Sequence, residues 1–452
     1  MKNRNFVNLT VNPCKMCMPL GAATALKGIE NSVNILHGSQ GCSTYIRRHM
    51  ATHYNEPIDI ASSSLNEKET VYGGAANLKQ GLKNVIRLYS PKVIGVSTTC
   101  LAETIGEDIN SIVTEFKEQE GIKDVSIVTV STPGYGPSEH EGYYLTIRRI
   151  IETLAEDEKP TNKINIIAGN ITPGDIRRIK EILDLFKIEY TIVSDISNTL
   201  DAGFNDKYKK LSPEGTKVED IKKMSGAIAT IEMGMFISDK ASPGKYLEDK
   251  FNVPLYRCPL PIGLENTDTF IELISHISNK KAPEKLVQER SRMIDGMIDS
   301  HKYNGEGRAA IFGDPELVYS VSKLCAENGI KPVLIATGAK IPNFKLKVEK
   351  NIELQEECVV LNDTDFETIY SYVKKLDINV LIGNSDGRFI VEKESIPLIR
   401  MGFPIHDRIG AQRKVFVGYE GSIRFLDEIT NTLIEEKFNS YRGDLYEKYF
   451  VK

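Results

Sequence analysis

The sequence of 452 residues contains no tryptophan and only seven cysteines and seven histidines. An odd number of cysteines in a long chain argues against a disulfide framework, which is typical of short secreted proteins. No apolar run approaches the roughly 20 residues that cross a bilayer. The N-terminal stretch MKNRNFVNLTVNP lacks the apolar core of a signal peptide. We therefore expect a cytoplasmic protein that has no membrane partner.

The charge balance excludes a further class of proteins. The net charge is −5, whereas proteins that bind nucleic acids carry dense lysine and arginine surfaces. The Gly-rich turns match neither GxGxxG nor GxxxxGK[ST], the usual phosphate-binding loops. We expect no nucleic-acid partner, and neither binding nor hydrolysis of ATP by this chain itself. Its hydrophobic fraction of 41% and charged fraction of 26% are those of a globular protein.

Short apolar segments, Gly- or Thr-rich turns and amphipathic stretches alternate along the chain. PKVIGVSTTC predicts a buried strand, and KINIIAGN and RAAIFGD begin similar units further on. This alternation predicts an α/β fold with three doubly wound, Rossmann-like domains built on parallel sheets. We place an N-terminal domain with the clustered cysteines at residues 1–160. The second domain and a linker helix take residues 161–300, and the third domain with C-terminal helices takes residues 301–452.

Four of the seven cysteines lie in the first hundred residues. Cys17 follows a Pro-containing loop in NPCKMCMPLG, Cys42 ends the turn HGSQGC, and Cys100 ends a predicted strand. Thiolates bind iron and zinc, and small flanking residues let backbone N–H groups approach cluster sulfides. The other cysteines of the chain are expected to pack in cores, where free cysteine is common: Cys258, Cys325 and Cys358.

The spacing of these cysteines does not make a complete site within the chain. Ferredoxin clusters use four closely spaced cysteines, and zinc ribbons use paired CxxC units. Here Cys14 and Cys17 form the single CxxC. Either a ligand other than cysteine or another subunit would complete a site built from Cys17, Cys42 and Cys100. Core packing of each cysteine, and a redox pair at Cys14 and Cys17, are the alternatives.

Five segments resemble the β-type subunits of the nitrogenase component 1 family: NPCKMCMPLGA, HGSQGC, HYNEPIDIASSSLNEKETVYGG, STTCLAETIGED and MGFPIHDRIGAQRKVFVGYEG. Their order and rough spacing agree over nearly the whole chain. The resemblance implies an α2β2 heterotetramer of homologous subunits, each of three α/β domains. It also implies an iron–sulfur cluster, [4Fe-4S] or an eight-iron P-cluster type, that bridges the α-type and β-type subunits. Cys17, Cys42 and Cys100 match the three cysteines that β-type chains supply, and the α-type subunit would supply the rest.

The resemblance has further implications for partners. An iron protein that hydrolyses ATP would dock transiently and deliver electrons. The α-type partner would hold an iron–molybdenum-type cofactor or its precursor. This chain would set ligands, burial and hydrogen bonds around the bridging cluster, and we identify no catalytic acid or base in it.

Details of the motifs bear on which member of the family this is. Catalytic β subunits carry a TPS segment whose serine can ligate the cluster, where this chain has Thr132–Pro133–Gly134 and places Ser131 on the other side. The segment IHDRIGAQR, which replaces a His-rich stretch of catalytic chains, and the NPCKM opening favour the N-type subunit of the cofactor-assembly scaffold, which is our main prediction. The three retained cysteines favour the alternative, the β subunit of a nitrogenase or of a nitrogenase-like reductase, for example of methylthio-alkanes, and the missing serine also fits such a reductase. A metal-free α/β binding protein is the remote alternative.

Several polar residues near these motifs have less specific roles. We expect ring stacking or capping rather than metal ligation of the histidines that flank Cys42, namely His37, His49 and His53. We expect exposed ion pairs for Arg47 and Arg48, with a cofactor passage or an acidic partner as the alternative. For Ser62 to Ser64 we expect a cap or turn. One continuous helix after Cys100 would carry acidic residues that favour its dipole or dock the iron protein: Glu103, Glu107 and Asp108. The late polar cluster of His406, Asp407 and Arg408 receives no role.

Overall fold

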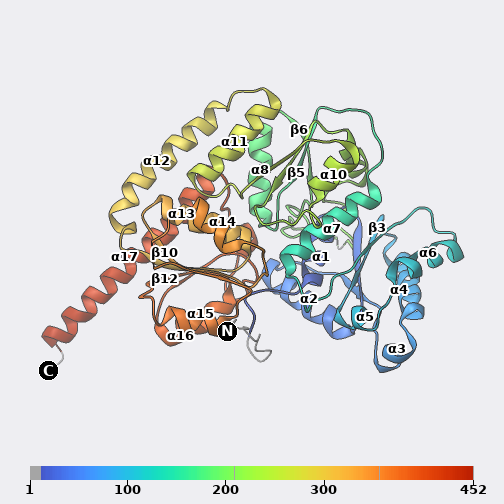
Figure 1. Ribbon diagram of the computed structural model, residues 1–452, viewed down its shortest axis with the longest axis horizontal. Coiled ribbons are helices and arrows are strands. Elements are labelled where there is room, and N and C mark those ends of the chain that lie inside the picture. Colours follow the sequence, from blue (N-terminus) through green and yellow to red (C-terminus); the bar gives the residue numbers. More distant parts are fainter. Residues whose placement is uncertain (1–11, 208, 356, 451–452) are drawn as a thin grey trace.

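A computed structural model describes residues 12–207, 209–355 and 357–450 of the chain. Helices and strands alternate along these residues and form three parallel sheets, which make three lobes around a common centre (Figure 1). The predicted α/β class with three doubly wound domains is therefore confirmed. The domain boundaries near residues 160 and 300 stay predictions. None of the helices in the described ranges is long and apolar enough to cross a membrane.

The first sheet has the strand order β2-β1-β3-β4, with β1 (Ser32–His37), β2 (Ile60–Ser62), β3 (Val93–Thr98) and β4 (Ser126–Val130). All residues of β1 and β3 are buried, as expected of parallel strands covered on both faces. Helices of this lobe are α1 (Met18–Lys27), α2 (Gln40–Tyr54), α3 (Glu67–Tyr72), α4 (Ala75–Tyr89), α5 (Cys100–Thr104), α6 (Ile109–Glu120) and α7 (Glu139–Leu154). The order of strands reverses between β1 and β3, where doubly wound sheets bind ligands.

The continuous helix predicted after Cys100 is wrong. The structure breaks it into α5 and α6, because Gly106 adopts a left-handed backbone with φ of 77°. The Asp108 side chain then accepts hydrogen bonds from the backbone N–H groups of Asn110 and Ser111, and so begins a new helix. Glu103 therefore lies on α5, and Glu107 lies in the connection between the two helices.

The second and third sheets follow the same plan with different strand orders. The second has order β6-β5-β7-β8, with β5 (Lys163–Ile167), β6 (Glu189–Val193), β7 (Ala229–Met233) and β8 (Leu255–Cys258), and helices α8 (Pro173–Leu185), α9 (Val218–Lys222), α10 (Pro243–Phe251) and α11 (Leu264–Ser278). The third has order β11-β10-β9-β12-β13, with β9 (Arg308–Phe312), β10 (Lys331–Thr337), β11 (Val359–Asn362), β12 (Val380–Gly383) and β13 (Leu398–Arg400), and helices α13 (Pro315–Glu327), α14 (Phe344–Asn351), α15 (Phe366–Val373) and α16 (Arg388–Glu394).

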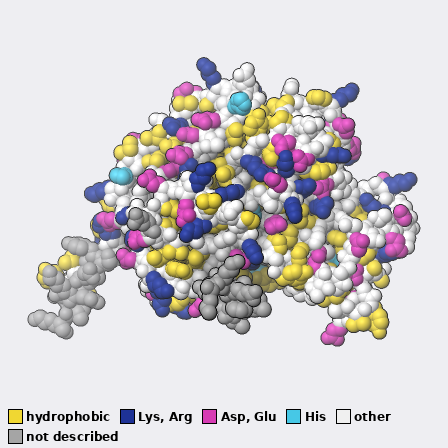
Figure 2. All heavy atoms as spheres, viewed as in Figure 1, with side chains coloured by type: hydrophobic (Ala, Val, Ile, Leu, Met, Phe, Trp, Pro, Cys, Tyr) yellow, Lys and Arg dark blue, Asp and Glu magenta, His cyan; other side chains and the backbone are white. Residues whose placement is uncertain are grey.

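Two long helices connect and extend these lobes. Helix α12 (Glu284–Asn304) packs against α17 (Gly418–Phe450), and the far end of α17 projects from the body of the molecule (Figure 1). On the face drawn in Figure 2, acidic and basic side chains are interspersed among apolar ones, so that neither sign of charge dominates.

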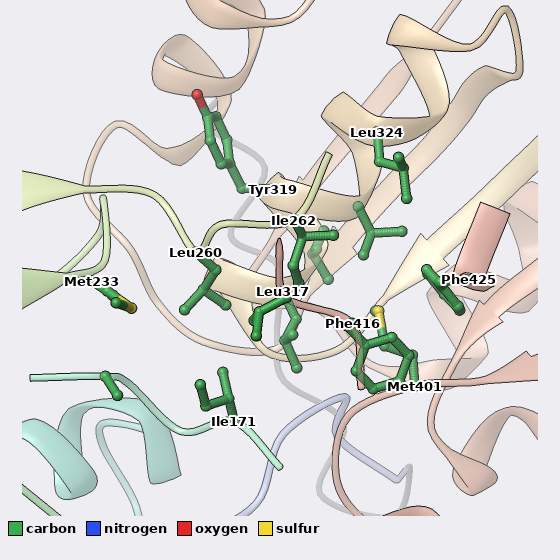
Figure 3. Close-up of a cluster of buried hydrophobic side chains, with 14 of the residues drawn as sticks. Ile171, Met233, Leu260, Ile262, Leu317, Tyr319, Leu324, Met401, Phe416 and Phe425 are labelled. Atoms are coloured by element: carbon green, nitrogen blue, oxygen red, sulfur yellow. The ribbon is translucent and has the colours of Figure 1, made fainter. Parts of the chain in front are cut away.

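The largest hydrophobic core joins the lobes. Figure 3 shows part of it, where Leu260 and Ile262 of the second lobe meet Leu317, Met401 and Phe416 of the third. Fully burying a side chain of this size stabilises the fold by about 1.5–3 kcal/mol. Two of the cysteines expected to pack in cores, Cys258 and Cys325, belong to this core, and Cys358 packs against it.

Candidate metal centre

Strands β1 and β3 bring two of the predicted ligands together. His37 and Thr98 are paired in the sheet, and the Thr99 N–H donates to the His37 carbonyl oxygen at 3.0 Å. Gly38 permits this close approach, because a Cβ atom there would lie 1.8 Å from Thr99 Oγ1. Cys100 follows Thr99 directly, and Cys42 lies in the first turn of α2, after the end of β1. Both cysteines therefore lie at the switch point of the first sheet.

The third predicted ligand reaches this place from a different part of the chain. Cys17 is the N-cap residue of α1 and pairs with Ser138 in an isolated antiparallel bridge. Ser138 ends the loop that follows β4, and Gly134 lies within that loop. A Cβ atom on Gly134 would be 3.0 Å from Cys100 Sγ and 3.4 Å from Cys17 Cβ. Cys17 and Cys100 therefore contact the same small residue.

The ionisation of the thiols shows the same convergence. Burial raises the pKa of Cys17 to about 11, against a hydrogen bond from the Leu20 N–H. The charge of Glu139 raises it further, followed by the charges of Cys42 and Cys100. Burial and the charge of Cys100 also raise the pKa of Cys42, while a hydrogen bond from Thr99 opposes this. Three neighbouring thiolates repel one another, and a bound cation relieves that repulsion.

The centre is open on one side. Cys17 and Cys42 are half-buried and Cys100 is exposed, and the adjacent Tyr45 and Tyr135 are 50% and 67% exposed. Within the described ranges, no three His, Cys, Asp or Glu side chains enclose a single metal ion. A tetrahedral zinc site would need such an enclosure. A polynuclear cluster spreads its thiolates around several irons, so the open arrangement suits a cluster shared with another chain.

Two local features fit an iron–sulfur cluster. The buried Thr99 hydroxyl makes no hydrogen bond of normal geometry to any described residue, yet it lies close enough to Cys42 to lower the pKa of that thiol. The Thr99 hydroxyl could thus donate to the Cys42 sulfur, and hydrogen bonds of this kind tune cluster potentials where the sulfur is a ligand. Gly134 supplies a surface without a side chain beside Cys100 and Cys17. The family resemblance had placed Gly134 where catalytic β subunits carry a cluster-ligating serine, whereas nothing in the sequence had singled out Thr99.

The histidines near Cys42 support the site rather than ligate metal. Nδ1 of His37 lies 2.9 Å from Ser63 Oγ, and Nε2 lies 3.4 Å from Glu107 Oε2. Ser63 also accepts from the Gly38 N–H at 3.0 Å. His37 thus links the Cys42 turn to the connection between α5 and α6 through hydrogen bonds, where stacking or capping was predicted. His49 does stack, on Tyr45, with ring centroids 4.3 Å apart.

His53 ties the helix of Cys42 to the third lobe. Its ring packs on Phe403 with centroids 4.7 Å apart, and its Nδ1 accepts from the Ile405 N–H at 2.9 Å. Burial lowers the pKa of His53 to about 3, so the ring stays neutral and Nδ1 can accept that hydrogen bond. His53 therefore packs on aromatic rings, at tilted and edge-on angles rather than in the predicted stack.

Other polar residues of the motifs also have structural partners. The Ser131 hydroxyl donates to Glu103 Oε1 at 2.5 Å, and the Thr98 hydroxyl donates to the same oxygen. Ser131 is thus bonded to α5. This agrees with its place before Thr132–Pro133–Gly134, whereas the family serine stands at the position of Gly134. In contrast, Arg47 and Arg48 are exposed and make no ion pair with any described residue, so their predicted pairing is wrong.

The late polar cluster is structural as well. Burial acts to raise the pKa of Asp407, but hydrogen bonds from Arg400 and Ser385 hold it at about 2. The His406 N–H also donates to the Ser385 hydroxyl, at 3.2 Å, and Arg408 pairs loosely with Asp407 at 3.7 Å. These contacts fix the segment that His53 binds.

Cys14 lies apart from the other three N-terminal cysteines. It is buried in the core of the third sheet, and burial raises the pKa of its thiol well above the ordinary value. Neither Cys14 nor Cys17 forms a disulfide. The CxxC motif is therefore divided between a core position and the edge of the candidate metal centre.

Comparisons with known proteins agree with this architecture. The family model described as nitrogenase component 1 type oxidoreductase matches residues 17–434. The molybdenum–iron protein β chain of Clostridium pasteurianum is 36% identical, over 95% of this chain and 94% of that protein. The vanadium–iron protein β chain of Trichormus variabilis is 34% identical, over 94% of both chains.

Solved structures give the same result. A chain of "Nitrogenase Cp1 at pH 6.5" superposes with a TM-score of 0.91 and 34% identity, over 95% of this chain and 94% of that chain. A chain of "Nitrogenase Cp1 at pH 5" has a TM-score of 0.69 and 13% identity, which shows likeness of fold alone.

Proposed function

The chain belongs to the nitrogenase component 1 type oxidoreductase family as a β-type subunit, and we propose that it is the β subunit of a nitrogenase or of a nitrogenase-like reductase. In this proposal Cys17, Cys42 and Cys100 hold one side of an iron–sulfur cluster. A homologous α-type subunit supplies the remaining ligands in an α2β2 heterotetramer. The observation that carries the proposal is the approach of three distant cysteines at one open edge of the first sheet.

The residues of this chain would bind and tune the cluster rather than perform acid–base chemistry. When bound, the cluster would supply storage and transfer of electrons delivered by an ATP-dependent iron protein. Thr99 would donate a hydrogen bond to the sulfur of Cys42, and Gly134 would leave room beside Cys100. The Cys17–Ser138 bridge and the His37 network would hold the three turns in place.

The cofactor-assembly scaffold, our main prediction from the sequence, becomes the second candidate. The comparisons favour the catalytic alternative, because the similar relatives described above are named as molybdenum–iron and vanadium–iron protein β chains. One observation separates this chain from the catalytic β subunit of molybdenum nitrogenase and fits either the scaffold or a nitrogenase-like reductase: Gly134 offers no hydroxyl to a cluster, and the Ser131 hydroxyl is bonded to Glu103.

Co-expression with an α-type partner tests these alternatives. The complex, purified without oxygen, is assayed for iron and then, with an iron protein and ATP, for reduction of acetylene and of a methylthio-alkane. Turnover of either substrate supports the reductase, with the substrate indicating its kind. Bound iron without turnover supports the scaffold. A folded complex without iron overturns both and supports the metal-free binding protein.

A further inference from the structure

A cavity of about 700 Å³ lies at the opposite end of the first sheet from the cysteines. Its lining comes from the end of α1, the start of β1, the segment before β2, and the loop between β6 and α9. Ser32 of β1 borders the cavity, whereas His37, at the other end of that strand, adjoins the Cys42 turn. At about 3.3 Å per residue this strand keeps the two sites on the order of 15 Å apart.

Lysines from two elements line this cavity. Lys207 and Lys209, on the loop between β6 and α9, are exposed and form no ion pair with any described residue. Lys210 is anchored through a hydrogen bond from its Nζ to the Leu88 carbonyl oxygen at 3.0 Å. Lys27, the last residue of α1, lies deeper, where burial lowers its pKa and Asp59 opposes that effect. Two flexible ammonium groups at the rim are thus available to an anion.

An aromatic ring and further polar groups border the same space. The side chain of Phe204, on the same loop, is 99% exposed at the cavity. An exposed ring of this size is a stacking surface for a base. The Thr199 hydroxyl is buried without a hydrogen-bond partner among the described residues. Carboxylates of Glu56 and Asp59 also line the cavity, and they are natural acceptors for sugar hydroxyls.

We propose that this cavity binds a nucleoside phosphate. Its phosphate groups would pair with Lys207 and Lys209, its base would stack on Phe204, and its sugar hydroxyls would donate to Glu56 or Asp59. The volume falls within the usual 300–1,000 Å³ of small-molecule sites. Carboxylates among the lysines disfavour a nucleic-acid strand, which needs a continuous basic surface. The proposal does not depend on the cluster.

Isothermal titration of the assembled complex, free of iron protein, tests this site. The probes are ATP, ADP and AMP, with adenosine, ribose 5-phosphate and inorganic phosphate as fragments. Nucleotides are expected to bind more tightly than any fragment. Phe204→Ala should weaken nucleotide binding about tenfold and leave ribose 5-phosphate unchanged, because it removes the stacking surface. Phe204→Trp keeps a ring and should restore the affinity.

Variants of the two lysines test the phosphate contacts independently. Lys207→Ala and Lys209→Ala should each weaken AMP binding about fivefold and leave adenosine unchanged. Lys281→Ala, an exposed lysine outside the cavity, is the matched control and should bind as the unaltered chain does. Three results would each overturn the proposal: no nucleotide binding up to about 5 mM, binding indifferent to Phe204→Ala, or inorganic phosphate binding as tightly as AMP. Unchanged circular dichroism and iron content would show that a variant remains folded.

Discussion

Cys17 pairs with Ser138 across an isolated antiparallel bridge, although 120 residues separate them in the sequence. The pairing extends to their neighbours: the Met16 N–H donates to Glu139 Oε2 at 2.6 Å, and the Glu139 N–H donates to the Met16 carbonyl oxygen at 3.0 Å. The start of α1 is thereby held against the start of α7, with the loop after β4 between them. This contact places Gly134 between Cys17 and Cys100.

Replacing Gly134 should therefore disturb the metal centre more than the fold. A valine there would crowd Cys100 Sγ and Cys17 Cβ, which lie 3.0 and 3.4 Å from the position of its Cβ atom. We expect Gly134→Val to lower the iron content of the complex, with a stability loss of about 1–3 kcal/mol. Gly136→Val is the control, because nothing lies within 4 Å of a Cβ atom at Gly136. Equal iron in both variants would show that Gly134 does not border the cluster.

Gly38 should be a stability position. Its Cβ atom would lie 1.8 Å from Thr99 Oγ1 and 2.7 Å from Thr99 Cβ, so the contact between the ends of β1 and β3 would have to open. We expect Gly38→Ala to reduce the free energy of unfolding by about 1–3 kcal/mol in urea denaturation. Gly41→Ala meets only Ser39 Oγ, at 3.6 Å, and should be nearly neutral. A neutral Gly38→Ala would mean that the two turns are not in contact.

His53 should make stability depend on pH. The fold lowers its pKa from 6.5 to about 3, so the unfolded chain binds the proton more readily. The contribution of neutral His53 is present above pH 6.5 and is lost as pH falls toward 3, at up to about 1.4 kcal/mol per pH unit. His53→Asn should flatten this part of the stability profile, whereas His276→Gln, an exposed histidine on α11, should not. The same slope in the Asn variant would refute the assignment.

The Arg178–Glu289 pair should hold α8 to α12. Both side chains are buried, at 5% and 1% exposure, and the guanidinium donates to the carboxylate. Arg178→Met leaves a buried carboxylate without this partner, which costs about 3–5 kcal/mol. A second substitution, Glu289→Leu, removes that charge and should recover most of the loss. Thermal unfolding of the single and double variants measures this, and additive losses would contradict it.

Much of the architecture could be predicted from local pattern. Buried apolar strands such as Val93–Thr98 are followed by amphipathic helices, and this alternation predicts parallel sheets. The position of Cys100 at the end of a predicted strand indicates the carboxyl edge of a sheet, whereas the sequence placed Cys42 only at the end of a Gly-rich turn. The error of element assignment was the single helix predicted after Cys100. The helical spacing of apolar residues continues across Gly106, but the helical backbone is interrupted there.

The details of the site could not be predicted in this way. The contacts of Gly134 with Cys17 and Cys100 depend on how a loop after β4 packs against α1, and no local pattern reports such a long-range contact. Likewise, the bond between His53 and Ile405 joins two lobes. The Thr99 hydroxyl is recognisable as part of the site only once its burial without a partner is known.

Iron content of the assembled complex tests the central claim most directly. The complexes carry Cys17→Ala, Cys42→Ala or Cys100→Ala, with Cys358→Ala as a control because this partly buried cysteine packs against the hydrophobic core away from the centre. Iron is measured per heterodimer and its cluster signature is recorded by Mössbauer spectroscopy. We predict that each of the three substitutions removes or alters the bridging cluster while the control keeps it. Full iron with an unchanged spectrum in all three would contradict the shared metal centre.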